Sequence, residues 1–300
     1  MNEVELGKVL AEMAQNLITI AGGLYCGNVF THKNNLYKLS KFEERLLVDK
    51  LPDTKQLTAR ELRAERNRIK MSELKLLKEA IRVLEENVDF HNLQTLYKNL
   101  KTVEVVQSPM LRIMGMGGSY NGRNNKLSYS AKSSIEHELL HLASTIYDEK
   151  TNTLLSGFWQ LKDGASIGRA INEGYTELLT RRYFNKDGKS YKAQVRIARM
   201  LELFFDDPKE MERLYFTSNL PGLIKYFEKY SDREDIIDFI VANDRMLQYY
   251  HEFSSLPTIT SINIQLKLNE WFEKKNAEQN KAEEFYDILN QNRIVKTLLK

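Results

Sequence analysis

The pattern H-E-x-x-H occurs at residues 137–141. On a helix, His137 and His141 are one turn apart and share a face, so both imidazoles can reach one metal ion. Glu138, beside the first histidine, can accept a proton from a water molecule on that ion. Zinc suits imidazole ligands and, at an open site, lowers the pKa of its water to about 7. The pattern therefore predicts a metal site able to activate water; the alternative is a pair of surface histidines on an amphipathic helix.

A catalytic zinc needs a third protein ligand, and a segment downstream offers two carboxylates. Glu173 and Glu177, within NEGYTE at residues 172–177, are also four apart and share a helical face. One can bind the metal while the other hydrogen-bonds the second ring nitrogen of a ligand histidine and fixes its tautomer. The alternative is an exposed acidic face paired with Arg181 and Arg182.

HELLH followed by NEGYTE resembles the active-site pair of the gluzincin zinc metallopeptidases, the thermolysin-like group. The resemblance covers about 40 residues and implies one zinc per chain. It assigns the metal ligands as His137, His141 and Glu173, the catalytic base as Glu138, and the support of a ligand histidine to Glu177. Two positions depart from the family pattern, which has Ser and Asp where this chain has Thr176 and Glu177.

The resemblance implies two further parts of an active site. Residues 118–130 precede the predicted metal helix, where such peptidases have an edge strand that pairs with an extended substrate. An ordinary hairpin with an Asn121-Gly122 turn is an equally good interpretation. Gluzincins also use a downstream Tyr or His to stabilise the oxyanion, and His251 or Tyr250 could serve here. A simple helical Tyr/His face is the alternative for these two.

Periodicity predicts a mainly α protein with a small β-sheet (α+β): a zincin-like catalytic core flanked by helical regions. The predicted divisions are residues 1–100, 101–187 and 188–300. Apolar residues at helical spacing predict a helix over 57–87. The other predicted elements are strands at 102–107 and 126–130, a helix from Ser133, a loop at 148–153 and a helix over 166–183. Capping boxes are predicted at Thr58/Glu61 and Ser133/Glu136, and helix starts or breaks at Pro208, Pro221 and Pro257.

Composition excludes several classes of protein. The chain has 300 residues, with 44 Lys plus Arg against 41 Asp plus Glu, and a net charge of +3 gives no electrostatic case for nucleic-acid binding. The single cysteine, Cys26, cannot form an internal disulfide. No basic signal-peptide start or apolar run of membrane-spanning length is found, so we expect a cytoplasmic protein without a membrane partner. Phosphate-binding glycine loops and G-x-S-x-G are also absent from the sequence.

Together these observations predict an intracellular zinc metallopeptidase acting on a peptide or protein substrate. Two rival hypotheses remain. The first is a zinc hydrolase with the same site and a non-peptide substrate. The second is a binding or regulatory protein that uses a zincin-like fold as a scaffold, since fold does not determine function. Retention of a base at Glu138 argues against the scaffold hypothesis.

Overall fold

The computed structural model describes residues 41–49, 56–186, 190–253, 258–275 and 278–291. The chain divides into two compact units, residues 1–45 and 46–300. Of the first unit only the beginning of helix α2 (Lys41–Val48) is described. The elements below belong to the second unit.

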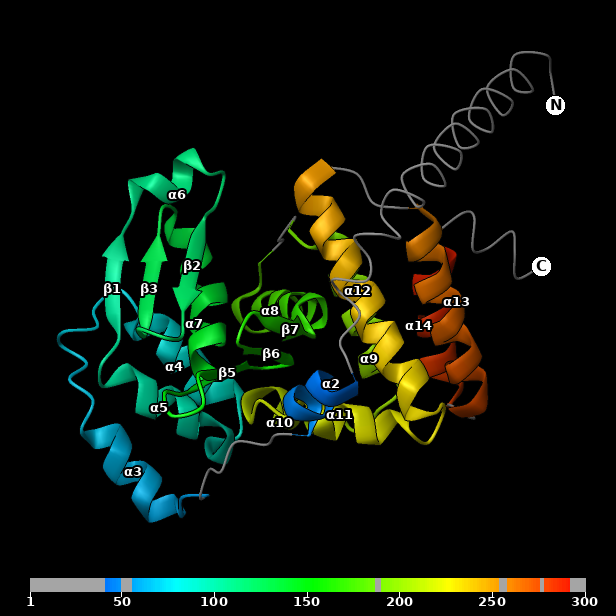
Figure 1. Ribbon diagram of the computed structural model, residues 1–300. Coiled ribbons are helices and arrows are strands. Elements are labelled where there is room, and N and C mark those ends of the chain that lie inside the picture. The colour runs from blue at the N-terminus through cyan, green and yellow to red at the C-terminus, as the bar shows by residue number, and fades with distance from the viewer. Residues whose placement is uncertain (1–40, 50–55, 187–189, 254–257, 276–277, 292–300) are drawn as a thin grey trace. The chain divides into compact units, whose positions relative to one another are not determined.

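Helices dominate this unit, and two small sheets lie among them, which confirms the predicted α+β class (Figure 1). The helices before the metal motif are α3 (Ala59–Asn67), α4 (Lys78–Asn87), η1 (Phe90–Leu93), α5 (Gln94–Leu100), α6 (Pro109–Ile113) and η2 (Lys132–Ser134). Those from the motif onward are α7 (Ile135–Ala143), α8 (Arg169–Phe184), α9 (Lys192–Glu202), α10 (Pro208–Phe216), α11 (Leu220–Phe227), α12 (Arg233–Phe253), α13 (Thr258–Lys275) and α14 (Gln279–Asn290). The division into regions 1–100, 101–187 and 188–300 stays a prediction.

The first sheet has three strands in the order β1-β3-β2. β1 (Glu104–Gln107) and β3 (Lys126–Tyr129) run parallel, while β2 (Gly118–Asn121) pairs antiparallel with β3. Both strands that the sequence predicts, at 102–107 and 126–130, are therefore present. β2 and β3 form a hairpin with a four-residue connection, so β2 lies at the sheet edge next to α7 (Figure 1).

The second sheet follows α7 directly and was not predicted. β4 (Thr145–Asp148), β5 (Thr153–Ser156), β6 (Trp159–Lys162) and β7 (Ala165–Ile167) form an antiparallel meander in chain order. The polar loop predicted at 148–153 is the turn between its first two strands. All four residues of β5 are buried, so the strand shows none of the polar–apolar alternation by which a half-buried strand is recognised.

Two predictions about helix starts differ in outcome. The capping box of Thr58 and Glu61 is present at the start of α3. The one predicted at Ser133 and Glu136 does not form, because the turn η2 precedes α7 and its N-cap, Ser134, makes no side-chain capping bond. The prediction of a single helix over 57–87 is also wrong: this segment forms two helices, α3 and α4, separated by turns at residues 68–77.

Helix α8 lies at the centre of the unit and contacts α7, α9 and α12. Its Gly174 is required by this packing, because a Cβ there would collide with the backbone carbonyl of Gln194 on α9. The N-terminus of α8 is held from α12, where the carboxylate of Asp244 accepts the N–H groups of Gly168 and Ala170, each at 2.7 Å. This capping fixes where α8 begins and so where its side chains point.

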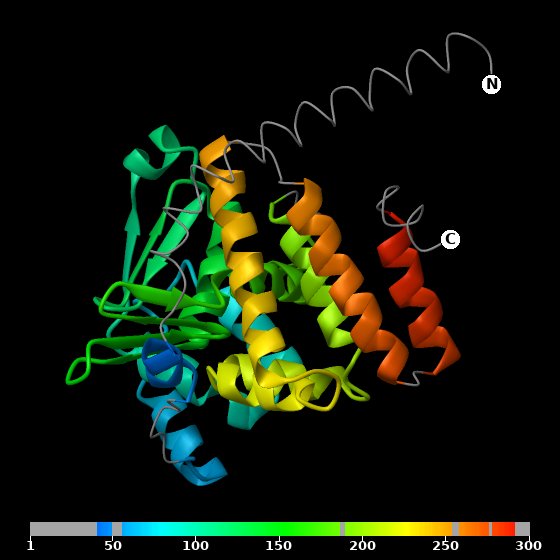
Figure 2. The same cartoon turned by 45° about the vertical axis from the view of Figure 1, so that its right-hand side comes forward.

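The C-terminal part is helical, as predicted. Pro208 and Pro221 lie at the first turns of α10 and α11, whereas Pro257 lies outside the described residues. Helices α12 and α13 pack side by side, and α13 and α14 contact α9 (Figure 2). None of the helices among the described residues is long and apolar enough to cross a membrane.

Candidate metal centre

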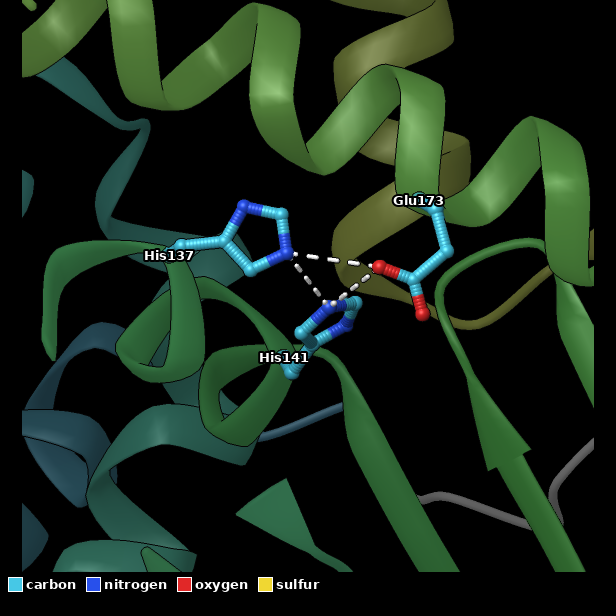
Figure 3. Close-up of side chains that lie close together, drawn as sticks. All are labelled: His137, His141 and Glu173. Carbon is cyan, nitrogen blue, oxygen red and sulfur yellow. Dashed lines mark hydrogen bonds and ion pairs between the residues drawn. The ribbon is translucent and has the colours of Figure 1, made fainter. Parts of the chain in front are cut away.

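Helix α7 presents both histidines of the H-E-x-x-H pattern toward α8. Its leucines Leu139, Leu140 and Leu142 are fully buried and fix the helix in the core. His137 and His141 lie on the face of the helix that turns toward α8, and their Nε2 atoms are 3.1 Å apart (Figure 3). Both rings therefore converge on one point, as the one-turn spacing predicts.

Glu173 of α8 completes a triangle of donor atoms. Its Oε2 lies 3.3 Å from Nε2 of His137 and 3.4 Å from Nε2 of His141 (Figure 3). Bonds of about 2.0–2.1 Å to a tetrahedral zinc separate two ligand atoms by about 3.3 Å, so the triangle fits such an ion with the fourth position open. Within the described parts of the chain, no other three His, Cys, Asp or Glu side chains meet in this way. The three residues form a group that could hold a metal ion.

The group is largely buried but keeps some exposure to solvent, since the side chains of His137, His141 and Glu173 are 12%, 10% and 12% exposed. Burial alone would raise the pKa of the Glu173 carboxyl, but the neighbouring histidines outweigh it and hold that pKa well below its usual range. Glu173 is therefore ionised, as a metal ligand must be.

Glu177 contacts the ring nitrogen of His137 that faces away from the triangle. Its Oε2 is 3.2 Å from Nδ1 of His137, while its Oε1 accepts from Nε of Arg181 at 3.1 Å. A proton held on Nδ1 by this carboxylate leaves Nε2 free to bind an ion. Glu177 is longer than the Asp of the gluzincin pattern, yet it contacts a predicted ligand histidine, as the resemblance implies. The alternative pairing with Arg181 is present as well, whereas Arg182 pairs with Glu202.

We expect Glu177→Ala to weaken zinc binding by about 10- to 100-fold, because His137 loses the partner that sets its tautomer and orientation. A competition titration against a chromophoric zinc chelator measures the change. A zinc affinity equal to that of the wild type would show that Glu177 only pairs with Arg181.

Asn172 lies against the corresponding nitrogen of the second histidine. Its Nδ2 is 3.4 Å from Nδ1 of His141, and its Oδ1 accepts the backbone N–H of Phe158 at 3.1 Å. The fully buried amide thereby ties the His141 ring to the second sheet. Sequence reasoning gave Asn172 no role, although its position directly before Glu173 in the motif was a usable signal.

Glu138 adjoins the donor triangle without being part of it and lies against the edge strand β2. It is 7% exposed, and the backbone N–H of Tyr120 on β2 donates to its carboxylate. A Cβ at Gly118 would stand 2.8 Å from Cγ of Glu138, so the glycine lets the strand lie directly on this side chain. Burial raises the pKa of Glu138 against the opposing effect of His141 and His137. A carboxylate of raised pKa beside a metal group is suited to accept and return a proton.

Tyr191, at the N-cap of α9, is a second residue that sequence reasoning missed. Its ring stacks on the ring of His137, with centroids 5.8 Å apart and planes at 15°. Burial raises the pKa of its hydroxyl, and the nearby Glu173 carboxylate raises that pKa further. No motif marks this tyrosine, because it enters the site from a loop beyond both motif helices.

The residues predicted to stabilise an oxyanion stay untested. Helix α12 runs through Tyr250 and His251, but their side chains lie outside the described residues. The remaining histidines gain no role: His32 is not described, and His91 is exposed on η1.

Zinc binding should depend on pH through His137. Burial alone would lower the pKa of this imidazole, but hydrogen bonds with Glu173 and Glu177 outweigh burial and raise it to about 10. In the metal-free protein the ring is therefore protonated at pH 7, and an ion must displace that proton. We expect zinc affinity to rise from pH 6 to pH 8, by up to about tenfold per pH unit. Chelator competition at several pH values measures this, and an affinity that stays constant or falls would contradict the protonated ring.

Comparisons of the chain with protein-family models, with curated proteins and with solved structures found no match. The likeness to gluzincins therefore rests on the two short motifs alone, and the geometry of α7 and α8 brings the side chains of these motifs together. That geometry supports a metal group of the H-x-x-x-H…E type.

Proposed function

We propose that this protein is a zinc-dependent metallopeptidase of the gluzincin type. The observation that carries the proposal is the position of Glu138, a buried carboxylate of raised pKa that adjoins the donor triangle without being part of it. A site that only stores or senses a metal needs three ligands and has no use for such a base.

Zinc held by His137, His141 and Glu173 would lower the pKa of a water molecule to about 7 and polarise the substrate carbonyl. Glu138 would accept a proton from the attacking water as its oxygen bonds to the carbonyl carbon. The same carboxyl would then return that proton to the amine nitrogen as the C–N bond breaks.

The choice of a peptide as substrate is supported by strand β2. Among the described residues it pairs only with β3, so its outer edge can accept an added extended chain. Because Gly118 brings β2 directly against Glu138, a chain added there passes close to the proposed base. A compact non-peptide substrate would make no use of this edge.

A peptide-library digest analysed by mass spectrometry tests the proposal. We expect cleavage by the zinc-loaded protein, loss of cleavage after chelation, and recovery on adding zinc back. Zinc binding without cleavage of any library peptide would contradict the peptidase and favour a scaffold or a non-peptide hydrolase. Cleavage that persists after complete zinc removal would place the chemistry outside this centre.

A further inference from the structure

Tyr191 contacts two of the three donor side chains at once. Its ring lies nearly parallel to the ring of His137, and its hydroxyl lies close to the Glu173 carboxylate. We propose that Tyr191 is a positioning residue of the metal centre and that Arg181 holds it in place. This inference rests on the metal site of the proposed function but not on peptide hydrolysis.

The backbone of Tyr191 indicates that its position is imposed by its surroundings. Its φ of 51° and ψ of 34° fall in the left-handed region, which disfavours bulky side chains. The non-glycine residues with positive φ among those described are Asn125, Asn152, Asp163, Asn185, Ser218 and Tyr191. Tyr191 is the one aromatic residue in that set. Such a conformation persists where the surrounding contacts determine it, and it is frequent at functional sites.

Arg181 supplies the contact that holds this turn. Its Nη2 donates to the backbone carbonyl of Ser190, directly before Tyr191, at 3.0 Å, and its Nε donates to Glu177 at 3.1 Å. The guanidinium is a rigid fork of donors and can make both bonds together. Arg181 on α8 therefore binds both the Glu177 carboxylate, which contacts His137, and the turn that places Tyr191.

His137 is in this way fixed from two directions. Glu177 holds its ring edge at Nδ1, and Tyr191 covers its ring face. The hydroxyl of Tyr191 adds a further contact to the Glu173 carboxylate, whose Oε2 lies beside both histidines and whose Oε1 is 3.9 Å from Nε of Arg169. Two ligands from different helices are thus aligned before an ion arrives, which lowers the ordering cost of binding.

The experiment compares Tyr191→Phe, Tyr191→Asn, Arg181→Gln and the double variant Arg181→Gln/Tyr191→Asn with wild type. Phenylalanine keeps the ring and removes the hydroxyl, while asparagine removes the ring and tolerates the left-handed backbone. Tyr147→Phe is the matched control, because the hydroxyl of Tyr147 donates to Asn152 in the turn between β4 and β5. Zinc affinity is measured by chelator competition, the visible spectrum is recorded at saturating Co²⁺, and thermal unfolding is followed on the metal-free proteins.

We expect Tyr191→Phe to weaken zinc binding by about tenfold and to shift the Co²⁺ spectrum. Tyr191→Asn and Arg181→Gln should each weaken it by about 10- to 100-fold, and the double variant by less than the product of the two. Unfolding of the metal-free Tyr191→Phe variant should match that of Tyr147→Phe.

Three results would overturn the inference. Zinc affinities of both Tyr191 variants equal to wild type would remove the positioning role. A double variant that equals the product of the single effects would show that Arg181 does not act through Tyr191. A wild type that binds no zinc would remove the metal centre itself and the proposed function with it. Zinc binding that depends on Tyr191 in a protein that cleaves no peptide would leave this inference standing while the peptidase fails.

Discussion

Glu138→Gln should lower peptide hydrolysis by at least about 10²-fold while zinc stays bound, which is the usual scale of general-base help. Glutamine keeps the size of the side chain and its ability to accept the N–H of Tyr120, but it cannot take up a proton. Since Glu138 lies outside the donor triangle, its replacement removes no ligand. The measurement is the rate of cleavage of one library-derived peptide at matched zinc content.

Glu136→Gln is the matched control for this test. Glu136 lies on the same helix, two residues away, and pairs with Lys186 at 2.6 Å instead of facing the donor group. The control should cleave at the wild-type rate. Equal rates for Glu138→Gln and Glu136→Gln would show that the base is a different group.

Glu173→Ala should cause the largest loss of metal affinity among the carboxylate variants. It removes a donor atom from the triangle, so the effect should exceed the roughly 10- to 100-fold expected of Glu177→Ala. His137 and His141 alone would leave the ion with two protein ligands, fewer than a catalytic zinc site requires. Chelator competition on both variants gives the ranking. A smaller loss for Glu173→Ala than for Glu177→Ala would reverse the roles assigned to the two carboxylates.

The convergence of the donor group was predictable because helical geometry links spacing to direction. Residues four apart on a helix share a face whatever the rest of the fold, so His137 with His141 and Glu173 with Glu177 could be paired from the sequence. The resemblance of the two motifs then predicted that the faces meet, and the structure brings them together. The group that contacts each ring nitrogen could not be predicted from spacing, because it depends on side-chain length. Glu177, which is longer than the Asp of the gluzincin pattern, still contacts Nδ1 of His137.

The elements that were missed lack a local signal. The buried strand β5 has no alternation, and the turn η2 takes the place of a capping box because Ser134, rather than Ser133, precedes α7. Asp244 caps the N-terminus of α8 although it lies more than seventy positions further along the chain than the residues that it caps. Tyr191 reaches His137 only through a left-handed turn at a residue type that rarely adopts one. Contacts of this kind arise from tertiary packing and leave no pattern at short range.

Zinc titration of the metal-free protein is the most direct test of the metal centre, because the proposed chemistry requires that His137, His141 and Glu173 bind one ion. We expect one zinc per wild-type chain and loss of most of that binding in His141→Ala. His91→Ala, which removes an exposed histidine outside the group, should bind zinc as the wild type does. A wild type that binds no zinc, or a His141→Ala variant that binds it as tightly as His91→Ala, would contradict this assignment of the ligands.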